Sequence, residues 1–518
     1  MSGLKQRDWQ PVHWFWLLCL CQVIFWTMGP WFIRENPVYD TMESIVWGNM
    51  WQWGYDKHPP FTAWVTGVLD WFWPGVHFQV YLFAQFCVLL TFLAVGVLAK
   101  EYLEARGRLL AVFLLTSILF YCNRVERFTP DTLQNPLWAW LVVSVYFSVT
   151  RQKIRYWLAA GILTGLCLLT KYQAVLILVA LFVALVSSEQ GRRCLRTPAP
   201  WLAFSLGFIL FLPHLLWLIE NDFSCLLYFE DEFLNKPLNY RAYYSWTDHL
   251  KSPAVFVLST LGNIAPLFIV MWPLYRGSRR QQFCGSFEQC FLLAVCFVPF
   301  ILSLSFGLIS GRHVVPRWAT PYFAWLPLTF LVFFPLQLTT RKVCQTLNSC
   351  IIFFLLFWTG RMTHLYISPI YSSKAWKNDV SAPLKEEMAK AELLWHKFSE
   401  LPLPYIAGLH YHAVGLTAYR SSPLTIPFLG LSESESRWMK KDDFYREGGM
   451  IVLNRGRKGY DDIVTRVEKE YSGALYLGTF SFKPLRVEKA KKPTLSVSDY
   501  YLVPPQMTTI TMKEKSRN

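Results

Sequence analysis

Residues 39–64 bring together side chains that could do chemistry, between the first and second long apolar segments of the chain. Among four tryptophans, this stretch holds five ionisable residues: Asp40, Glu43, Asp56, Lys57 and His58. Ionisable groups between membrane spans are costly unless they are solvated, paired or used. Cations beside carboxylates suit an anionic, phosphate-bearing ligand together with a general base. We therefore expect the rest of the chain to hold this stretch at one face of a membrane.

The composition is that of a polytopic membrane protein. The chain has 518 residues, of which 53% are hydrophobic and 17% aromatic, and its mean hydropathy is +0.26. An ordinary soluble enzyme is less apolar. The net charge is +15, but the basic residues form short clusters between apolar segments, so no nucleic-acid partner is expected. The 12 cysteines show no paired or metal-binding spacing, and we expect them to face lipid or the core.

Eleven apolar segments predict membrane-spanning helices, because a bilayer core takes roughly 20 residues per helix and somewhat fewer in tight hairpins. They lie near residues 13–33, 78–99, 108–122, 133–149, 156–170, 173–188, 201–219, 254–275, 288–307, 319–336 and 345–361. The first segment has no small-residue cleavage site, so we expect it to stay as a span rather than to act as a cleavable signal peptide.

Every second loop is rich in Lys and Arg, as cytoplasmic loops are. These loops hold Lys5 and Arg7; Lys100, Arg106 and Arg108; Arg151, Lys153 and Arg155; Arg192, Arg193 and Arg196; Arg276, Arg279 and Arg280; and Arg341 and Lys342. The alternation predicts a multi-pass protein of the inner membrane, with a cytoplasmic N-terminus and a periplasmic C-terminal tail.

The tail after residue 362 differs from the rest of the chain because it is polar and alternates short helix-like and strand-like runs. The helix-like runs cover residues 383–398 and 460–471, and the strand-like runs cover 404–408, 424–429, 450–454, 474–480 and 500–503. We therefore predict a transmembrane catalytic domain over residues 1–362, with an outer-face loop at 34–77, and a small periplasmic α/β domain over residues 363–518. The last residues, 512–518, are expected to be disordered.

The loops on the predicted outer side are mixed in charge instead of poor in basic residues. Their cations are Lys57, His58, Arg124, Arg127, Lys171, Arg312, His313 and Arg317. Their carboxylates are Asp40, Glu43, Asp56, Glu126, Asp131, Glu220 and Asp222. Such charges recur in five separate loops of one face, which favours a binding site over a set of unrelated solvated ion pairs.

Each of the most interesting charges also has a structural alternative. Asp40 is either the base that takes a proton from an acceptor hydroxyl or a helix cap, and Asp131 follows Thr-Pro in a context that caps a helix well. Lys57, His58 and Lys171 either meet a phosphate or extend along apolar surface to the membrane interface. The sequence contains no loop typical of nucleotide binding and no zinc-protease or serine-hydrolase motif. An enzyme built from these residues is therefore expected to take its donor from the membrane.

Five motifs resemble those of the lipid-phosphate-sugar-dependent membrane glycosyltransferases, a superfamily that includes the dolichyl-phosphate-mannose protein mannosyltransferases and the lipid A aminoarabinose transferases. In chain order they are Asp40 with Trp47-Gly48 and Gly54-Tyr55-Asp56-Lys57-His58-Pro59-Pro60; Phe128-Thr129-Pro130-Asp131; the run from Gly165 to Thr170-Lys171-Tyr172; the run from Pro213 through Trp217 to Asp222; and Pro316-Arg317-Trp318. The resemblance covers nearly the whole chain. It implies a GT-C fold, in which about eleven membrane-spanning helices and further helices at the outer membrane face precede a small exported domain.

The resemblance also implies roles for residues at matching positions. Asp40 and Asp131 match the acidic positions that act in catalysis. The donor phosphate or another part of the substrate is expected to be bound by Lys57, His58, Lys171, Arg317, Tyr55 and Glu43. No residue is assigned to a metal.

Two departures from the family pattern leave alternatives open. Many members have Asp-Glu where this chain has Asp40-Thr41, so the second carboxylate is either missing or supplied by Glu43. The pair Lys57-His58 stands where many members have a single basic residue, so either of the two is the residue that meets the donor phosphate.

The residues and the resemblance together predict a glycosyltransferase that works at the outer face of the inner membrane. The donor is a hexose or pentose on a polyprenyl phosphate, and the acceptor is lipid A, the lipopolysaccharide core, another glycan or a protein. No cofactor is required for this chemistry, and the sequence leaves open whether a divalent metal takes part. The alternative is a lipid or glycolipid transporter or flippase, which should show inverted repeats and charges near the bilayer midplane. The sequence shows no repeat, and its ionisable groups gather at one face.

Overall fold

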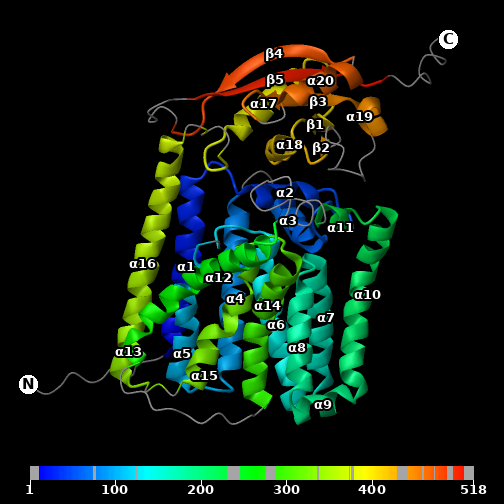
Figure 1. Cartoon of the computed structure of the whole chain (residues 1–518). Coiled ribbons are helices and arrows are strands. Elements are labelled where there is room, and N and C mark those ends of the chain that lie inside the picture. Colours follow the sequence, from blue (N-terminus) through cyan, green and yellow to red (C-terminus); the bar gives the residue numbers. More distant parts are fainter. Residues whose placement is uncertain are drawn as a thin grey trace, which may run out of the picture.

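The computed structural model describes residues 11–73, 77–123, 125–229, 245–275, 287–334, 336, 338–372, 374, 378–428, 441–457, 460–471, 473–486 and 494–506. Several predictions concern residues outside these ranges, namely those on Lys5, Arg7, Arg124, Arg276, Arg279, Arg280, the strand end at Leu429 and the segment 512–518. Figure 1 shows a bundle of long helices beneath a small α/β domain that the C-terminal part of the chain forms.

Long helices joined by short ones make up the bundle. The long helices are α1 (Pro11–Ile33), α4 (Phe78–Ala99), α6 (Pro130–Arg151), α7 (Ile154–Thr170), α8 (Ala174–Val186), α10 (Pro198–Glu220), α12 (Asp248–Val270), α14 (Phe287–Ser310) and α16 (Thr340–Tyr371). The short helices are α2 (Tyr39–Gly48), α3 (Phe61–Phe72), α5 (Ala105–Phe113), α9 (Glu189–Leu195), α11 (Ser224–Phe229), α13 (Trp272–Tyr275) and α15 (Leu326–Phe333). Turns of 3₁₀ helix lie at Leu114–Ser117, Leu119–Tyr121, Pro316–Ala319 and Tyr322–Trp325.

Among the described residues, six helices are long and apolar enough to cross a membrane, or seven if α8 and α9, which are bent by 111° at their junction, form one span. The six are α1, α4, α10, α12, α14 and α16. The predicted segments 108–122 and 319–336 are instead divided between short α-helices and 3₁₀ turns. A multi-span helical protein is thus confirmed, whereas the number of eleven spans and the domain boundary at residue 362, which falls inside α16, stay predictions.

The outward faces of the bundle are apolar. Large hydrophobic side chains stand more than half exposed along these helices, for example Phe204 (65%), Leu258 (68%), Ile269 (72%) and Leu356 (70%). In water, such surfaces would cost free energy in proportion to their apolar area. They suit the hydrocarbon core of a bilayer.

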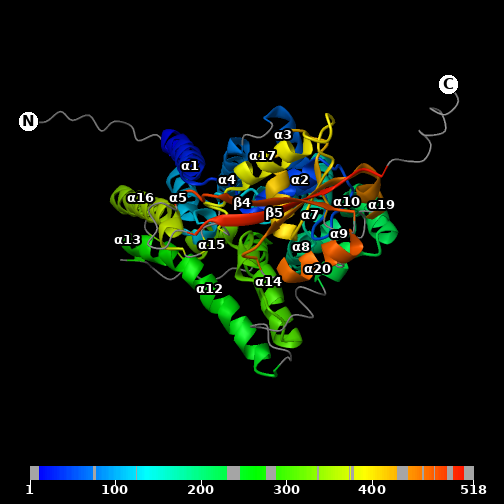
Figure 2. The same ribbon diagram turned by 90° about the horizontal axis from the view of Figure 1, so that it is seen from above.

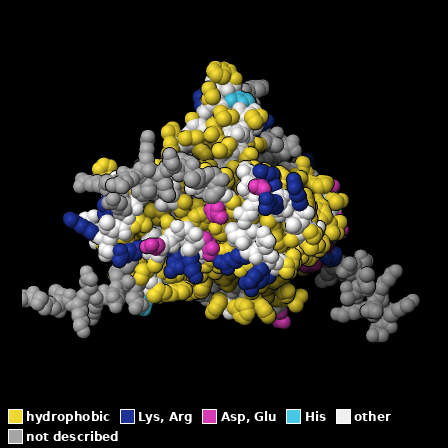
Figure 3. All heavy atoms as spheres, turned by 90° about the horizontal axis from the view of Figure 1, so that it is seen from below, with side chains coloured by type: hydrophobic (Ala, Val, Ile, Leu, Met, Phe, Trp, Pro, Cys, Tyr) yellow, Lys and Arg dark blue, Asp and Glu magenta, His cyan; other side chains and the backbone are white. Residues whose placement is uncertain are grey.

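The basic loops meet at the end of the bundle opposite the C-terminal domain. They join α4 to α5, α6 to α7 and α15 to α16, and α9 lies at the same end (Figure 1). Figure 3 shows Lys and Arg side chains gathered on this face. The arrangement fits the positive-inside rule, and on that rule we keep the prediction that this face is cytoplasmic.

The C-terminal domain is built on a sheet whose described strands are β1 (Tyr405–Ala407), β2 (Ile426–Phe428), β3 (Gly449–Asn454), β4 (Leu475–Phe482) and β5 (Ser496–Val503). Their order is β2-β1-β3-β5-β4. β1 is parallel to β2 and β3, with Ile406 opposite Met450, and β5 is antiparallel to β3 and β4. The predicted strands are confirmed, and β5 begins earlier than predicted. The helices α17 (Leu384–Trp395) and α20 (Tyr460–Glu470) confirm the two helix-like runs, whereas α18 (His410–Thr417) and α19 (Lys441–Glu447) are new.

Helices cover both faces of this sheet. On one face, Phe444 of α19 and Val467 of α20 pack in a cluster with strand residues such as Leu453. On the other face, α17 and α18 share a hydrophobic cluster with two residues of α2, Met42 and Val46. Seen from above, β4 and β5 run past α2, while α3 stands clear of them at the edge of the molecule (Figure 2). The helix α2 therefore belongs to the core of the C-terminal domain as well as to the membrane domain.

The helices α2 and α3 touch backbone to backbone where Gly48 meets Gly67. A Cβ atom at Gly48 would lie 2.3 Å from the carbonyl oxygen of Ala63 and 2.4 Å from the amide nitrogen of Gly67. Nearby, the hydroxyl of Thr66 donates a hydrogen bond of 2.6 Å to the carbonyl of Ser44. This contact fixes the position of α2 against the bundle.

We expect Gly48→Ala to destabilise the protein by about 1–3 kcal/mol, the usual cost of overpacking, because two backbones must separate to admit the methyl group. Thermal unfolding in detergent should show a lower Tm than in the wild type. Gly262→Ala is the matched control, since a Cβ at Gly262 in α12 meets nothing within 4 Å. An unchanged Tm in Gly48→Ala would mean that the α2–α3 contact is not tight.

Candidate active site

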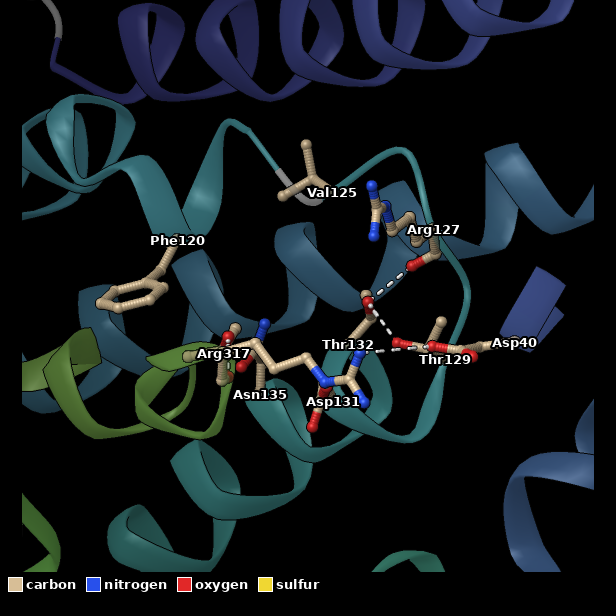
Figure 4. A pocket seen from close by; sticks show the side chains of 10 residues that line it. Asp40, Phe120, Val125, Arg127, Thr129, Asp131, Thr132, Asn135 and Arg317 are labelled. Carbon is tan, nitrogen blue, oxygen red and sulfur yellow. Dashed lines mark hydrogen bonds and ion pairs between the residues drawn. The ribbon is translucent and has the colours of Figure 1, made fainter. Parts of the chain in front are cut away.

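A pocket lies at the start of α6, between α2 and the 3₁₀ turn at Pro316–Ala319 (Figure 4). It encloses about 380 Å³, including the space that opens to solvent. The residues that line it are Asp40, Phe120, Val125, Arg127, Thr129, Asp131, Thr132, Asn135, Arg317 and Thr320. The structure thus brings three of the predicted site residues, Asp40, Asp131 and Arg317, to one pocket.

Neither acidic residue caps a helix. In α2 the N-cap position is held by Val38, and no side chain accepts a hydrogen bond from the first turn, in which Asp40 lies. In α6 the N-cap is Thr129, again without a side-chain cap, and Asp131 lies in the first turn. Both carboxylates are therefore available for other contacts, and they benefit from the positive end of the helix dipole.

Charges of opposite sign alternate across the pocket. An Nη of Arg317 lies 3.9 Å from Oδ2 of Asp40, and its Nε lies 3.7 Å from Oδ2 of Asp131. On the far side of Asp131, the Nζ of Lys171 donates a hydrogen bond of 2.5 Å to Oδ1. Arg317 thus connects the two carboxylates, and Lys171 holds Asp131 in place. Lys171 is thus paired with a carboxylate in this structure, and its predicted contact with phosphate stays a prediction.

The surroundings of the Asp40 carboxyl group increase its affinity for a proton relative to a solvated aspartate. Although 44% of its side chain is accessible, this surface faces the pocket, and protein atoms surround the rest. Burial raises the pKa of Asp40 above its ordinary value of 3.8, and the positive charge of Arg317 limits the rise. A carboxylate with a raised pKa is a stronger base than a solvated one.

Arg127 adds a cation that the sequence analysis places in an outer loop but does not assign to the site. Its Nε atom is buried, and the described residues offer it no hydrogen-bond partner; the same holds for Oδ1 of Asn135. Both residues line the pocket (Figure 4). Buried polar atoms are normally satisfied by protein, water or a ligand. With Arg317 and Lys171, this residue gives three cations against two carboxylates, so the site attracts an anion.

Lys57 and Glu43 form a second charged group, in which one oxygen takes three donors. The Oε1 atom of Glu43 accepts hydrogen bonds from Nζ of Lys57 at 2.8 Å, from Nε2 of His410 at 2.9 Å and from the hydroxyl of Tyr39 at 3.2 Å. Burial opposes the charge on Glu43, but Lys57 and His410 outweigh it and lower the pKa to about 2. Lys57 is thus already paired with a carboxylate.

The His58 side chain has no hydrogen bond among the described residues, although the backbone carbonyl of this residue accepts one from the amide of Tyr55 at 3.2 Å. Burial, together with the positive charge of Lys171, lowers the pKa of His58 to about 3. The imidazole is therefore neutral at pH 7, and one of its nitrogens carries a proton that it can donate.

Tyr55 does not reach the pocket. Its side chain is fully buried, and its hydroxyl donates a hydrogen bond of 2.6 Å to the carbonyl of Trp47, on whose ring it stacks at 5.0 Å. Gly54 packs equally closely on Trp217, whose ring atom would lie 2.3 Å from an added Cβ. These motif residues shape the loop before α3 and do not line the pocket. The structure places Tyr55 in the packing of this loop, and its predicted contact with the substrate stays a prediction.

The C-terminal domain reaches this region, which the sequence analysis misses. His410 contacts Glu43 across 367 residues of chain, and the ring of Tyr411 lies 4.1 Å from that of Tyr39. No local pattern signals such a contact, because α18 lies in a different predicted domain. In the part of the chain that the structure describes, no group of three or more His, Cys, Asp or Glu side chains is placed to hold a metal ion.

Comparison with known proteins bears on the fold. Residues 57–217 match the family model of the dolichyl-phosphate-mannose-protein mannosyltransferases. No curated protein sequence matches the chain. The crystal structure of ArnT from Cupriavidus metallidurans bound to undecaprenyl phosphate matches with a TM-score of 0.60 and 14% identity, over 96% of this chain and 99% of that one. The apo structure of the same protein gives a TM-score of 0.60 and 13% identity over the same shares. The predicted GT-C fold is confirmed.

Proposed function

We propose, from the GT-C fold of this chain, that the protein is a glycosyltransferase that moves a sugar from a polyprenyl-phosphate donor to an acceptor. The observation that carries the proposal is the pocket in which Arg317 lies between the carboxylates of Asp40 and Asp131. The family match and the undecaprenyl phosphate in the similar ArnT structure support a lipid-phosphate donor. We place the site at the outer face of the inner membrane, as the loop charges predict.

The reaction that fits these residues is a displacement at C1 of the donor sugar. An oxygen of the acceptor forms a bond to C1, the bond from C1 to the phosphate oxygen breaks, and the polyprenyl phosphate leaves with the electron pair. When the acceptor is a hydroxyl, its proton passes to Asp40. When the acceptor is a phosphate, it is already ionised at neutral pH and needs no base. The cations stabilise the charge that develops on the leaving phosphate.

The placement of the cations favours different roles for Lys57 and His58, a choice that the motifs leave open. Lys57 is paired with Glu43, whereas the His58 side chain has no hydrogen bond among the described residues. We therefore assign His58, with Arg317, to the donor phosphate, and Lys171 to holding Asp131. Glu43 then acts as the partner of Lys57 rather than as a second catalytic carboxylate.

We expect His58→Ala to lower kcat/KM for the donor by about ten- to a hundredfold, because a hydrogen bond to a charged group contributes about 1.5–3 kcal/mol. The Tm of this variant should stay near that of the wild type. Lys57→Met should show the opposite pattern: a lower Tm, because it leaves the buried carboxylate of Glu43 without its cation, and a smaller effect on donor use. Donor kinetics measured in proteoliposomes distinguish the two. The reverse result would make Lys57 the phosphate ligand.

The function itself is tested by incubating the purified protein in proteoliposomes with polyprenyl-phosphate mannose, radiolabelled in the sugar, and a total glycolipid extract as acceptor. Donors carrying other hexoses and pentoses follow in the same assay. We expect label to move to an acceptor while unlabelled polyprenyl phosphate is released. Comparing the glycolipids of a deletion strain with those of the wild type by mass spectrometry identifies the natural product. Movement of the intact donor across the bilayer without sugar transfer would instead support the transporter.

A further inference from the structure

The helix α18 of the C-terminal domain lies against α2, the helix that carries Asp40. We propose that this helix completes the active site: His410 positions Glu43 and Lys57, and Tyr411 forms part of the wall that receives a sugar ring of the substrate. The inference rests on the proposed function and deepens it. It makes the C-terminal domain a part of the catalytic machinery rather than an appendage.

The contact between His410 and Glu43 is buried and specific. The exposed fractions of the side chains are 5% for His410, 3% for Glu43 and 13% for Lys57. Lys57 and His410 both bind the same oxygen of Glu43, Oε1. An ionised carboxylate is acceptor-only, so Nε2 of His410 donates. Because Glu43 follows Asp40 by three residues on α2, the two side chains lie on one face of the helix. The hydrogen bond from His410 to Glu43 therefore also restrains the part of α2 that carries Asp40.

This hydrogen bond is not needed to hold the domains together. The membrane domain and the C-terminal domain are already joined by the hydrophobic cluster that contains Met42 and Val46, and by the ion pair of Arg420 with Asp70 at 3.0 Å. The structure therefore points to positioning as the role of His410.

Aromatic rings surround the amine of Lys57. Its Nζ lies 5.3 Å from the ring centre of Tyr39 and 5.6 Å from those of Tyr411 and Tyr228. Tyr411 is 57% exposed, so its ring is accessible to a ligand. Lys57 and Tyr39 both bind Glu43, so this group of rings lies beside the residue that follows Asp40 by one turn of α2.

An exposed aromatic wall with a few polar groups is the usual form of a small-molecule site. The C–H face of a sugar ring packs on such rings, while the hydroxyls of the sugar reach the tyrosine oxygens. The ring that binds here belongs either to the donor or to a glycan acceptor. A donor sugar and a glycan acceptor offer the same ring chemistry to this site. Measuring the KM of the donor and of the acceptor in turn distinguishes the two.

The test compares Tyr411→Ala and Tyr411→Phe with the wild type, with polyprenyl-phosphate mannose as donor and the glycolipid extract as acceptor in proteoliposomes. We expect Tyr411→Ala to raise the KM of one substrate about two- to tenfold with little change in kcat, since a stacking contact is modest. Tyr411→Phe should keep most of the affinity. The substrate whose KM rises is the one whose ring contacts Tyr411.

His410→Ala should lower kcat about ten- to a hundredfold, the factor that corresponds to losing a hydrogen bond to a charged group. His410→Gln should recover much of this loss, because its amide can donate to Glu43. Arg420→Met is the matched control: it removes a buried contact between the same two domains without touching the pocket. We expect it to lower Tm and to leave kcat unchanged in the folded fraction.

Each outcome decides the assignment. Unchanged KM values for both substrates in Tyr411→Ala, with an active wild type, would overturn the sugar wall. If kcat fell equally in His410→Ala, His410→Gln and Arg420→Met, α18 would serve only to join the two domains, and His410 would not position Glu43. A wild-type protein that transfers no sugar from any polyprenyl-phosphate donor would overturn the proposed function and this inference together.

Discussion

Asp40→Asn is expected to reduce turnover by about 10²–10⁴-fold when the acceptor is a hydroxyl, the range for losing a general base. Asn keeps the size of the side chain and its contact with Arg317 but cannot take a proton. Single-turnover transfer from the radiolabelled donor measures the effect without product release. If the acceptor is a phosphate, the loss should be smaller, since Asp40 then only helps to place the reacting groups.

The pH dependence gives an independent check on Asp40. The base must be ionised to act, and burial raises its pKa above 3.8, so activity should fall on the acid side at a higher pH than for a solvated aspartate. Below that pKa, kcat/KM should drop about tenfold per pH unit, and this acid limb should vanish in Asp40→Asn. Asp222→Asn, at an exposed carboxylate in the turn after α10, is the control and should leave both rate and profile unchanged. Full activity in Asp40→Asn would falsify the assignment.

Removing Arg317 is expected to have the second largest effect. Among the described residues, Arg317 is the cation that lies within 4 Å of Asp40, and it also lies 3.7 Å from Asp131. Its removal takes away the positive charge that connects the two carboxylates. Taking away one preorganised donor to developing charge costs about 10²–10³-fold in kcat. Arg317→Ala should show this loss, and Arg317→Lys should recover only part of it, because a lysine cannot span both carboxylates with a rigid fork.

A second consequence of Arg317→Ala concerns the proton affinity of Asp40. The positive charge of Arg317 opposes the rise in the pKa of Asp40, so its removal should move the acid limb of the pH profile to still higher pH. Lys251→Ala, at an exposed cation near the start of α12, should cause neither change. A variant lacking Arg317 that keeps normal kcat and an unshifted profile would place this residue outside the reaction.

Much of the architecture can be read from local patterns. Long apolar runs predict the helices of the bundle, and alternating short runs predict β1 to β5, because each element buries its own apolar side chains at its own period. Asp40, Asp131, Lys171 and Arg317 are likewise predicted from short motifs, and the structure brings these four together.

What the sequence does not predict depends on contacts between distant segments. In α18, nearly every residue from His410 to Thr417 is buried, so the helix shows no polar face and no helical period to detect. Glu43 pairs with both Lys57 and His410, and the contact with His410 depends on how the tail folds over α2. Among the described residues, it is therefore the side chain of His58, rather than that of Lys57, that has no hydrogen bond. Tyr55 follows the family motif, yet its ring packs on Trp47 because the loop turns it inward.

Because α2 shares a core with the C-terminal sheet, α2 is fully packed only after the C-terminal part of the chain has been made. Met42 and Val46 leave the ribosome early, but the residues that cover them, such as Met450 and Leu502, are made near the end of translation. Domains generally fold as units while synthesis proceeds from the N-terminus. The membrane helices can therefore be in place while α2, and Asp40 with it, still lacks its final support. The pocket beside Asp40 is therefore complete only once the tail has been made and has folded onto α2.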